Sequence, residues 1–379
     1  MFMMIRVTPA RRAAVLIAAA AATALALSGC ASPQAGQSTA GRAQPDTGTV
    51  TTLGTQGQVW RLAGGTIYVR SGRNWTSIRP PLVPAAGGSV ITRGKLVLVA
   101  SIRGMTLTVS SSRDGGTTWT KHTAQLRTPA AGATIVLSPD GRRYVVGPNM
   151  RTNAGSASQY SPGFINETDG SLTALTMPGP ASSLAWVGSA LLVTGGPANT
   201  HLYLSTDLGA SWKDVSADLL GFTPPSANVP VTGPFFGPIV GLSDGAAIIP
   251  AERMTTSGQL SIDLYTTRTG LSYSTIGTLS VPGDYSGGPI SLAISSYGTD
   301  QAILAEPGTT DLIVINDQRI TARIHVSGLP VTPDAISFQD ASNGVAQTTV
   351  RSCANGKTDC TENVTSYATT DGGQTWKVA

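Results

Sequence analysis

Charged residues are scarce in this chain, at 12% of 379 residues, and only four of them are glutamates. Histidine occurs three times, as His122, His201 and His325, without the spacing of metal ligands. The sequence also lacks a glycine-rich phosphate loop, a nucleophile elbow and a calcium-loop motif. We therefore expect neither a cofactor nor a metal, and the common signatures of nucleotide-dependent enzymes and serine hydrolases are missing.

The first 29 residues have the parts of an export signal. A basic segment without acids precedes an unbroken run of small apolar residues, 13–27, which ends in Leu27-Ser28-Gly29-Cys30. That run is too short for a membrane-spanning helix, and its flanks are typical of a signal peptide. Leu-Ser-Gly-Cys resembles the lipobox of bacterial lipoproteins; ordinary cleavage near Ala31 is the alternative. We expect an exported chain, anchored to the cell membrane by a lipid on Cys30 and facing the extracytoplasmic side.

Removal of this leader leaves a chain that is close to neutral. Of 25 basic residues, Arg6, Arg11 and Arg12 lie in the leader, so 22 remain against 21 acidic residues. The calculated pI of about 9.0 is therefore no sign of an anionic partner, and we expect no nucleic acid. Residues 30–49 are rich in Ser, Gly, Gln, Ala and Pro and lack apolar periodicity, which predicts a flexible tether. Residues 50–379 remain as the folded domain.

The folded part is expected to be all-β. Glycine and proline are abundant, at 44 and 24 residues, and no segment shows a helical apolar period. Short runs rich in β-branched residues alternate instead with turn signals. The runs are Thr66–Val69, Lys95–Ala100, Ala133–Leu137, Tyr144–Val146, Ala190–Thr194, Ile262–Thr266 and Leu312–Ile315.

One eight-residue pattern recurs: a hydroxyl residue, any residue, Asp, any residue, Gly, any residue, a hydroxyl residue and Trp. It occupies 112–119, 205–212 and 369–376, with weaker copies at 267–273 and 71–75. The carboxylate can accept hydrogen bonds from amides of the turn, and the glycine can adopt a positive φ. The pattern predicts a tight turn whose Trp leads the next strand and fills space between sheets. Its residues in the three full copies are Asp114, Gly116, Trp119, Asp207, Gly209, Trp212, Asp371, Gly373 and Trp376.

The spacing of these turns indicates a β-propeller. Trp75 and Trp119 are 44 residues apart, and the longer gaps accommodate about two units or one enlarged unit. One such turn per unit of this length is typical of four-stranded propeller blades. We expect seven blades, with six as the alternative if the thin first unit only completes the last one. The expected units are 50–80, 88–126, 132–177, 182–217, 229–281, 289–327 and 334–379.

The turns resemble the Asp-box, or BNR repeat, and the match is specific in three units. Asp-box propellers include sialidases, some endoglucanases, sortilin-type peptide receptors and photosystem II assembly factors. The resemblance implies that the Asp-box residues lie on the blade rim and are structural.

A sialidase activity would need an arginine triad, a Tyr nucleophile with its Glu, and an Asp acid/base. Asp284-Tyr285-Ser286, followed by Glu306, is similar to the Tyr region of that family, and Arg79 lies in a faint match to its Arg-Ile-Pro motif. Tyr285, Glu306 and Arg79 are therefore the catalytic candidates if the protein is a hydrolase. The second and third arginines and the acid/base have no counterpart, so the resemblance favours a non-enzymatic propeller.

Two further features bear on function. The insertion 218–237 contains Phe222, Phe235 and Phe236, and we predict a binding loop with these rings on an exposed apolar rim. Cys353 and Cys360 flank an Asn-Gly turn, and export favours a disulfide between the two arms of a hairpin over a metal site.

The sequence thus favours a non-catalytic binding or assembly scaffold in the cell envelope, monomeric and attached to the membrane by its lipid. Its partner would be an envelope protein or a glycan. The alternatives are an exo-sialidase-type glycoside hydrolase and a carbohydrate-binding module.

Overall fold

A computed structural model of the chain places its described residues in an all-β domain. The structure describes residues 51–53, 59–63, 66–71, 74–78, 88–127, 130, 133–148, 163–167, 169–177, 179, 181–196, 199–220, 235–254, 260–281, 292–297, 300–338, 340–354 and 359–378. The predicted signal peptide, Cys30 and the predicted tether lie outside these residues. In the described part of the chain, no helix has the length and apolar character needed to cross a membrane.

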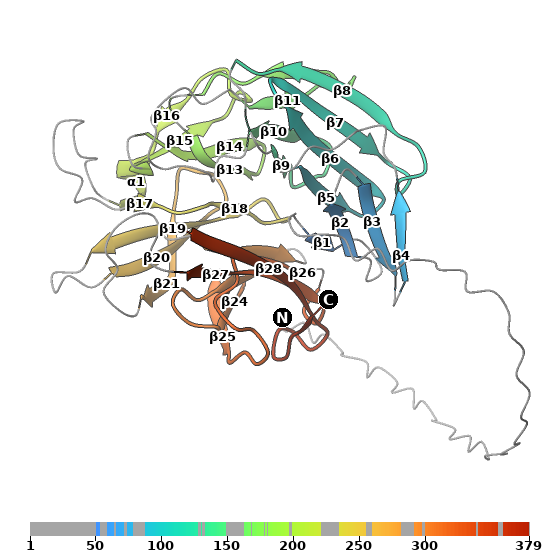
Figure 1. Cartoon of the computed structure of the whole chain (residues 1–379). Helices are drawn as coiled ribbons and strands as arrows, with labels where there is room; N and C mark the ends of the chain where they lie inside the picture. The colour runs from blue at the N-terminus through green and yellow to red at the C-terminus, as the bar shows by residue number, and fades with distance from the viewer. Residues whose placement is uncertain are drawn as a thin grey trace, which may run out of the picture. The chain divides into compact units, whose positions relative to one another are not determined.

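The strands form seven antiparallel sheets that follow one another along the chain (Figure 1). The first three sheets contain β1 Thr51–Leu53, β2 Val59–Ala63, β3 Thr66–Ser71 and β4 Asn74–Ile78; β5 Ser89–Arg93, β6 Leu96–Arg103, β7 Thr106–Ser112 and β8 Thr120–Gln125; and β9 Ala133–Leu137, β10 Tyr144–Pro148, β11 Phe164–Asn166 and β12 Leu172–Ala174. The fourth contains β13 Ala181–Val187, β14 Ala190–Gly195, β15 His201–Ser205 and β16 Lys213–Asp214.

The last three sheets complete the set. The fifth contains β17 Phe235–Phe236, β18 Val240–Gly241, β19 Ala247–Met254, β20 Leu260–Thr267 and β21 Ser274–Ser280. The sixth contains β22 Ile294–Tyr297, β23 Gln301–Ala305, β24 Leu312–Asn316 and β25 Arg319–Ile324, and the seventh β26 Ala335–Phe338, β27 Gly344–Ala354, β28 Asp359–Thr369 and β29 Lys377–Val378. A single-turn helix, α1 Ser216–Leu220, follows β16.

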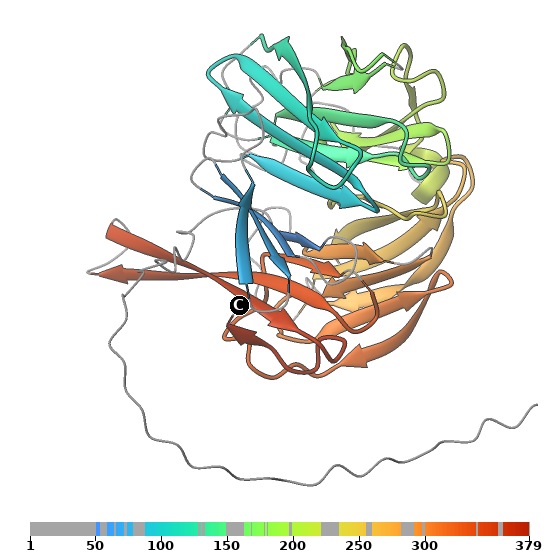
Figure 2. The same cartoon turned by 90° about the vertical axis from the view of Figure 1, so that its right-hand side faces the viewer.

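The sheets are arranged as a β-propeller. The innermost strand of each sheet contacts the innermost strand of the next, and β1 contacts both β5 and β26, so the series closes on itself. Figures 1 and 2 show the sheets side by side around a centre. Six blades run from β5 to β29, and the short first sheet lies between the last blade and the second sheet. The structure thus shows six blades rather than the seven expected, which is the alternative that the sequence allowed, and the expected unit 50–80 corresponds to the short first sheet.

The hydrophobic core lies between neighbouring sheets. Six apolar clusters in the described residues each combine side chains of two consecutive sheets. A second strand is therefore covered on both faces: all six residues of β14 are buried. Outer strands have a neighbour on one side only, and five of the six residues of β25 are exposed. The seven β-branched runs expected as strands lie in strands, except that Lys95 precedes the first residue of β6.

Candidate functional site

The recurrent eight-residue pattern forms the connection between the third and fourth strands of its sheet. In the seventh sheet, Asp371 Oδ1 accepts from the amide of Thr375 at 3.0 Å, and its Oδ2 accepts from the Thr375 hydroxyl at 2.5 Å. The hydroxyl residue before the Trp of the pattern therefore makes two hydrogen bonds to one carboxylate, one from its amide and one from its side chain. This explains why the pattern has a hydroxyl residue at that position. Asp114 and Asp207 make the same two bonds to Thr118 and Ser211.

The first hydroxyl residue and the glycine complete each turn. Thr369 donates its hydroxyl to Asp371 and accepts a hydrogen bond from the amide of Gly373 at 3.0 Å. Gly373 has a φ of 94°, and Gly116 and Gly209 have φ values of 94° and 88°. Since side-chain-bearing residues resist this conformation, the glycine of the pattern is a backbone requirement. The predicted turn chemistry is confirmed in all three full copies.

The tryptophans of the turns pack between sheets, as predicted. Trp376 is buried, and its ring meets that of Phe338 edge-on with centroids 5.9 Å apart. Its indole N–H donates to the carbonyl of Gly373 at 2.9 Å, and Trp119 makes the equivalent bond to Gly116. Trp212 instead donates to the carbonyl of Thr176, which follows β12 of the preceding sheet. Each ring therefore joins its own turn to an inter-sheet core.

The hydrogen bonds hold these carboxyl groups in their ionised form. The Thr375 hydroxyl, followed by the Thr375 amide, lowers the pKa of Asp371 to about 2, and Ser211 does the same to the pKa of Asp207. The pKa of Asp114 is lowered too, chiefly by the Thr118 hydroxyl. A carboxylate whose lone pairs are used by its own turn is poorly suited to proton transfer in catalysis.

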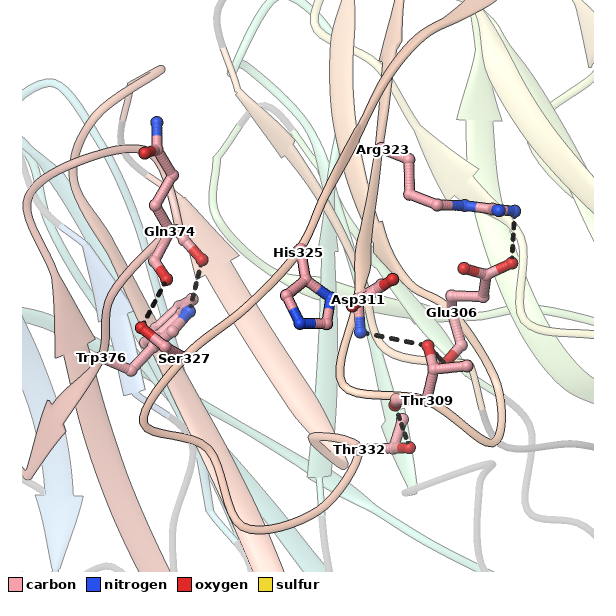
Figure 3. A network of polar contacts seen from close by, with 10 residues as sticks. Glu306, Thr309, Asp311, Arg323, His325, Ser327, Thr332, Gln374 and Trp376 are labelled. Atoms are coloured by element: carbon pink, nitrogen blue, oxygen red, sulfur yellow. Dashed lines mark hydrogen bonds and ion pairs between the residues drawn. The ribbon is translucent and has the colours of Figure 1, made fainter.

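A second group of polar residues lies in the sixth sheet (Figure 3). It is located where the third strand, β24, begins, whereas the recurrent turns follow the third strand of their sheets. Glu306 follows β23, and Arg323 lies on β25, where an Nη donates to Glu306 Oε1 at 2.6 Å. The Glu306 side chain is 7% exposed, whereas that of Arg323 is 58% exposed. The pair therefore joins a buried carboxyl group to a solvent-accessible guanidinium group.

The loop between β23 and β24 is held by its own hydrogen bonds. Glu306 donates its amide to the carbonyl of Asp311 at 2.8 Å, and the Thr309 hydroxyl accepts from the amide of Asp311 at 3.0 Å. Thr332 donates its hydroxyl to the carbonyl of Thr309, and His325 Nδ1 lies 2.9 Å from Asp311 Oδ1. These contacts fix the position of Glu306 and bring a second carboxylate near it.

Burial is the main influence on Glu306. It raises the pKa of this carboxyl group, the Arg323 guanidinium opposes the shift, and Asp311 adds to it. A carboxyl group with a raised pKa can serve as a general acid. In the described contacts, however, its oxygen faces Arg323 and no tyrosine.

The fifth sheet contains a similar pair that the sequence did not reveal. Asp263 on β20 is buried, forms an ion pair with Arg253 on β19 and accepts from the Thr278 hydroxyl at 2.7 Å. Arg253 is 58% exposed, like Arg323. The alternation in 260–267 places Asp263 on the face opposite Leu260, Ile262 and Leu264, so neither its burial nor its partners could be inferred without the strand register.

The predicted apolar rim is wrong for Phe236. Phe236 is fully buried in the cluster between the fourth and fifth sheets, because β17 pairs with β19 and turns this ring inward. Phe235 is half-buried, with its backbone opposite Glu252. Phe222, Arg79, Tyr285 and Cys30 lie outside the described residues.

The longest hairpin of the domain carries the two remaining cysteines. β27 and β28 pair over eleven residues each, from Gly344↔Thr369 to Ala354↔Asp359, and Cys353 stands directly opposite Cys360. β26 accompanies β27 only as far as Gln347, and β29 accompanies β28 only at Tyr367 and Ala368. Residues 348–354 and 359–366, here named the β27–β28 arm, therefore form a two-stranded ribbon, which extends beyond the other strands in Figure 2.

An open pocket of about 290 Å³ lies between the third and fourth sheets. Arg143, Glu167 and Asp207 supply its charged groups. Asp207 is already bonded to its own turn, so Glu167 and Arg143 are the other charged residues that line the pocket.

No protein-family model matches this sequence, and neither does any curated protein. Among solved structures, virginiamycin B lyase from Staphylococcus aureus is 16% identical with a TM-score of 0.46, covering 78% of this chain and 89% of that one. YCF48 bound to a D1 peptide is 13% identical with a TM-score of 0.47, covering 76% and 84%. An uncharacterised protein of Listeria monocytogenes is 11% identical with a TM-score of 0.49, also covering 76% and 84%. The ligands and reactions of these proteins do not transfer to this chain.

Proposed function

We propose that this protein is a non-catalytic binding or assembly scaffold, exported and attached to the cell membrane through a lipid on Cys30. The β27–β28 arm is the observation that carries this proposal. Among the described side chains, none of the arm belongs to an apolar cluster between sheets, so this extension of the two middle strands adds nothing to the inter-sheet core. Such an extension is suited to contact with a partner, which is an envelope protein in this proposal.

The arm is also where a disulfide would be useful. An isolated two-stranded ribbon is marginally stable in water. Residues directly opposite in an antiparallel pair have Cβ atoms about 5 Å apart, close to disulfide geometry. We propose a bond between Cys353 and Cys360 that holds the tip of the arm together. Thiol labelling of the denatured protein, with and without prior reduction, tests it: the two cysteines should label only after reduction.

The blade count is part of the proposal. We propose that β1–β4 forms a seventh blade, supported by its four antiparallel strands and by the contacts of β1 with β5, β26 and β27. Deletion of residues 50–80 should then destabilise the whole ring. A truncated chain with an unchanged melting temperature would favour six blades.

In-cell crosslinking of the full chain tests the scaffold. One variant has residues 350–363 replaced by Asn-Gly, a sequence that closes a two-residue hairpin. We expect the crosslinked envelope protein to be lost while the melting temperature is retained. Met105→Ser is the matched control, since Met105 is 49% exposed at the equivalent connection of the second sheet. Equal recovery from the shortened arm and from Met105→Ser would reject the arm as the binding element.

A glycoside hydrolase is the second candidate, because Glu306 is a buried carboxyl group with a raised pKa. Hydrolysis of a sialoside by the wild type, abolished in both Glu306→Gln and Tyr285→Phe, would establish it. We expect the wild type to hydrolyse the sialoside no faster than buffer without protein does.

A further inference from the structure

The outer edge of β28 is one of two edges of the arm along which the described residues form no neighbouring strand; the other is the β27 edge from Thr348 to Ala354. In the strand order β26–β27–β28–β29, β29 occupies the outer position but covers two of the eleven residues of β28. The outer strands β4, β8, β21 and β25 extend over five to seven residues each. From Asp359 to Ser366, no described strand takes this position.

A strand edge carries a specific chemistry. Along an antiparallel strand, alternate residues direct their N–H and C=O groups toward opposite neighbours, so one set on β28 bonds to β27 and the other faces outward. The complement of such a row is another extended backbone. A segment added antiparallel to β28 would lie in line with β29 and complete the outer strand of the sheet.

Edges that must stay unpaired usually have a bulge, a proline or a lysine. The register of β27 and β28 runs through all eleven pairs without a shift. The segment 359–366 contains no proline and no lysine, and its charges, Asp359 and Glu362, are confined to the half nearest the tip. Nearer the sheet, Asn363 is exposed, whereas Val364 and Thr365 are half-buried. This half of the edge therefore has good strand formers and no device against pairing.

We propose that the outer edge of β28, from Asp359 to Ser366, binds an extended polypeptide segment of a protein partner as an added antiparallel strand. This proposal rests on the scaffold function and names its mode of recognition. Backbone hydrogen bonds supply the affinity, and the hydroxyl and β-branched side chains select a segment that is itself a good strand former. About eight residues of the partner would be ordered along roughly 25 Å of β28.

Hydrogen exchange on the full chain tests this directly. The probe is a synthetic peptide of about eight alternating Thr and Val residues, and its matched control is the same peptide with every backbone nitrogen methylated, so that neither edge can donate. We expect the unmodified peptide to slow exchange at alternate amides of residues 359–366 by about tenfold. The methylated peptide lacks the donors and should leave exchange unchanged. Protection by both peptides, or by neither, would overturn the proposal.

Proline variants locate the edge. Of the consecutive residues Asn363 and Val364, one directs its N–H outward and the other directs its N–H to β27. One of Asn363→Pro and Val364→Pro should therefore abolish protection by the peptide while the melting temperature is retained. If neither does, the peptide binds elsewhere and the proposal falls.

Two other outcomes are distinguishable. Concentration-dependent dimerisation of the chain, abolished by the same proline variant, would show that a second copy occupies the edge and would overturn the proposal of a partner protein. If the shortened arm loses its crosslinked partner but exchange at β28 is unaffected by peptide or partner, strand addition is rejected and the scaffold function stands.

Discussion

Trp212, in the turn of the fourth sheet, donates its indole N–H to the carbonyl of Thr176, which follows the last strand of the third sheet, with nitrogen and oxygen 2.5 Å apart. The turn is thus a clamp between sheets as well as a connection between strands. The seventh sheet is tied in a similar way: Ser327, which follows β25, donates its amide to the carbonyl of Gln374 and accepts from the amide of Trp376 (Figure 3). Loss of a turn should therefore loosen the contact between two sheets.

Asp371→Ala should lower the melting temperature by several degrees without affecting partner binding. The substitution removes the acceptor of both Thr375 bonds, and the turn that positions Trp376 loses its internal support. Thr370→Ala is the matched control, because Thr370 is exposed in the same turn. Thermal unfolding followed by circular dichroism provides the measurement. An unchanged melting temperature accompanied by lost partner binding would make Asp371 a binding residue.

The turns should also govern acid stability. The folded-state pKa values of Asp207 and Asp371 are lowered to about 2, so their contribution is fully present above the ordinary value of 3.8. It is lost as the pH falls from about 4 to about 2. Chemical unfolding across this range should show a smaller decline for the Asp207→Asn, Asp371→Asn double variant than for the wild type. Parallel declines would mean that other carboxyl groups control acid unfolding.

Phe236→Ala should destabilise the domain by about 3–5 kcal/mol, because it removes a fully buried ring from the core between two sheets. Urea unfolding measures the change. Phe235→Ala is the control, since that ring is only half-buried and should cost much less. If Phe236→Ala left stability intact and weakened partner binding, the ring would be exposed, as the sequence had suggested.

Arg323→Gln should cost about 1–3 kcal/mol at neutral pH, because it leaves the carboxylate of Glu306 buried without its cation. The pKa of Glu306 is already raised, and the folded state of the variant should bind this proton still more tightly. Stability of the variant should therefore increase as the pH falls through that pKa. Arg319→Gln, an exposed position on the same strand, is the control. The same pH profile in both variants would contradict the pairing.

Local patterns made much of the fold predictable. All the groups that define the recurrent eight-residue turn lie within those eight residues, so the residue types alone specify its hydrogen bonds. The distance between successive copies indicates the length of the repeat. The Glu306–Arg323 and Asp263–Arg253 pairs depend on the register between strands, which no short pattern encodes. The inward orientation of Phe236 depends in the same way on how β17 pairs with β19.

The β27–β28 arm could be predicted from the sequence only in part. The Asn-Gly flanked by Cys353 and Cys360 predicted a hairpin, and the backbone register confirms that these residues face each other. The proposed role of the arm depends on the relative lengths of the four strands, which the sequence does not reveal. β27 and β28 continue well past the ends of β26 and β29.

The most direct test of a scaffold that binds through its arm is crosslinked-partner recovery from cells expressing the wild type, the arm-shortened chain or Glu306→Gln. The account predicts that Glu306→Gln recovers the same envelope protein as the wild type and that the arm-shortened chain recovers none. Recovery by the shortened arm, together with a sialoside hydrolysis that disappears in Glu306→Gln, would contradict it and establish an enzyme in its place.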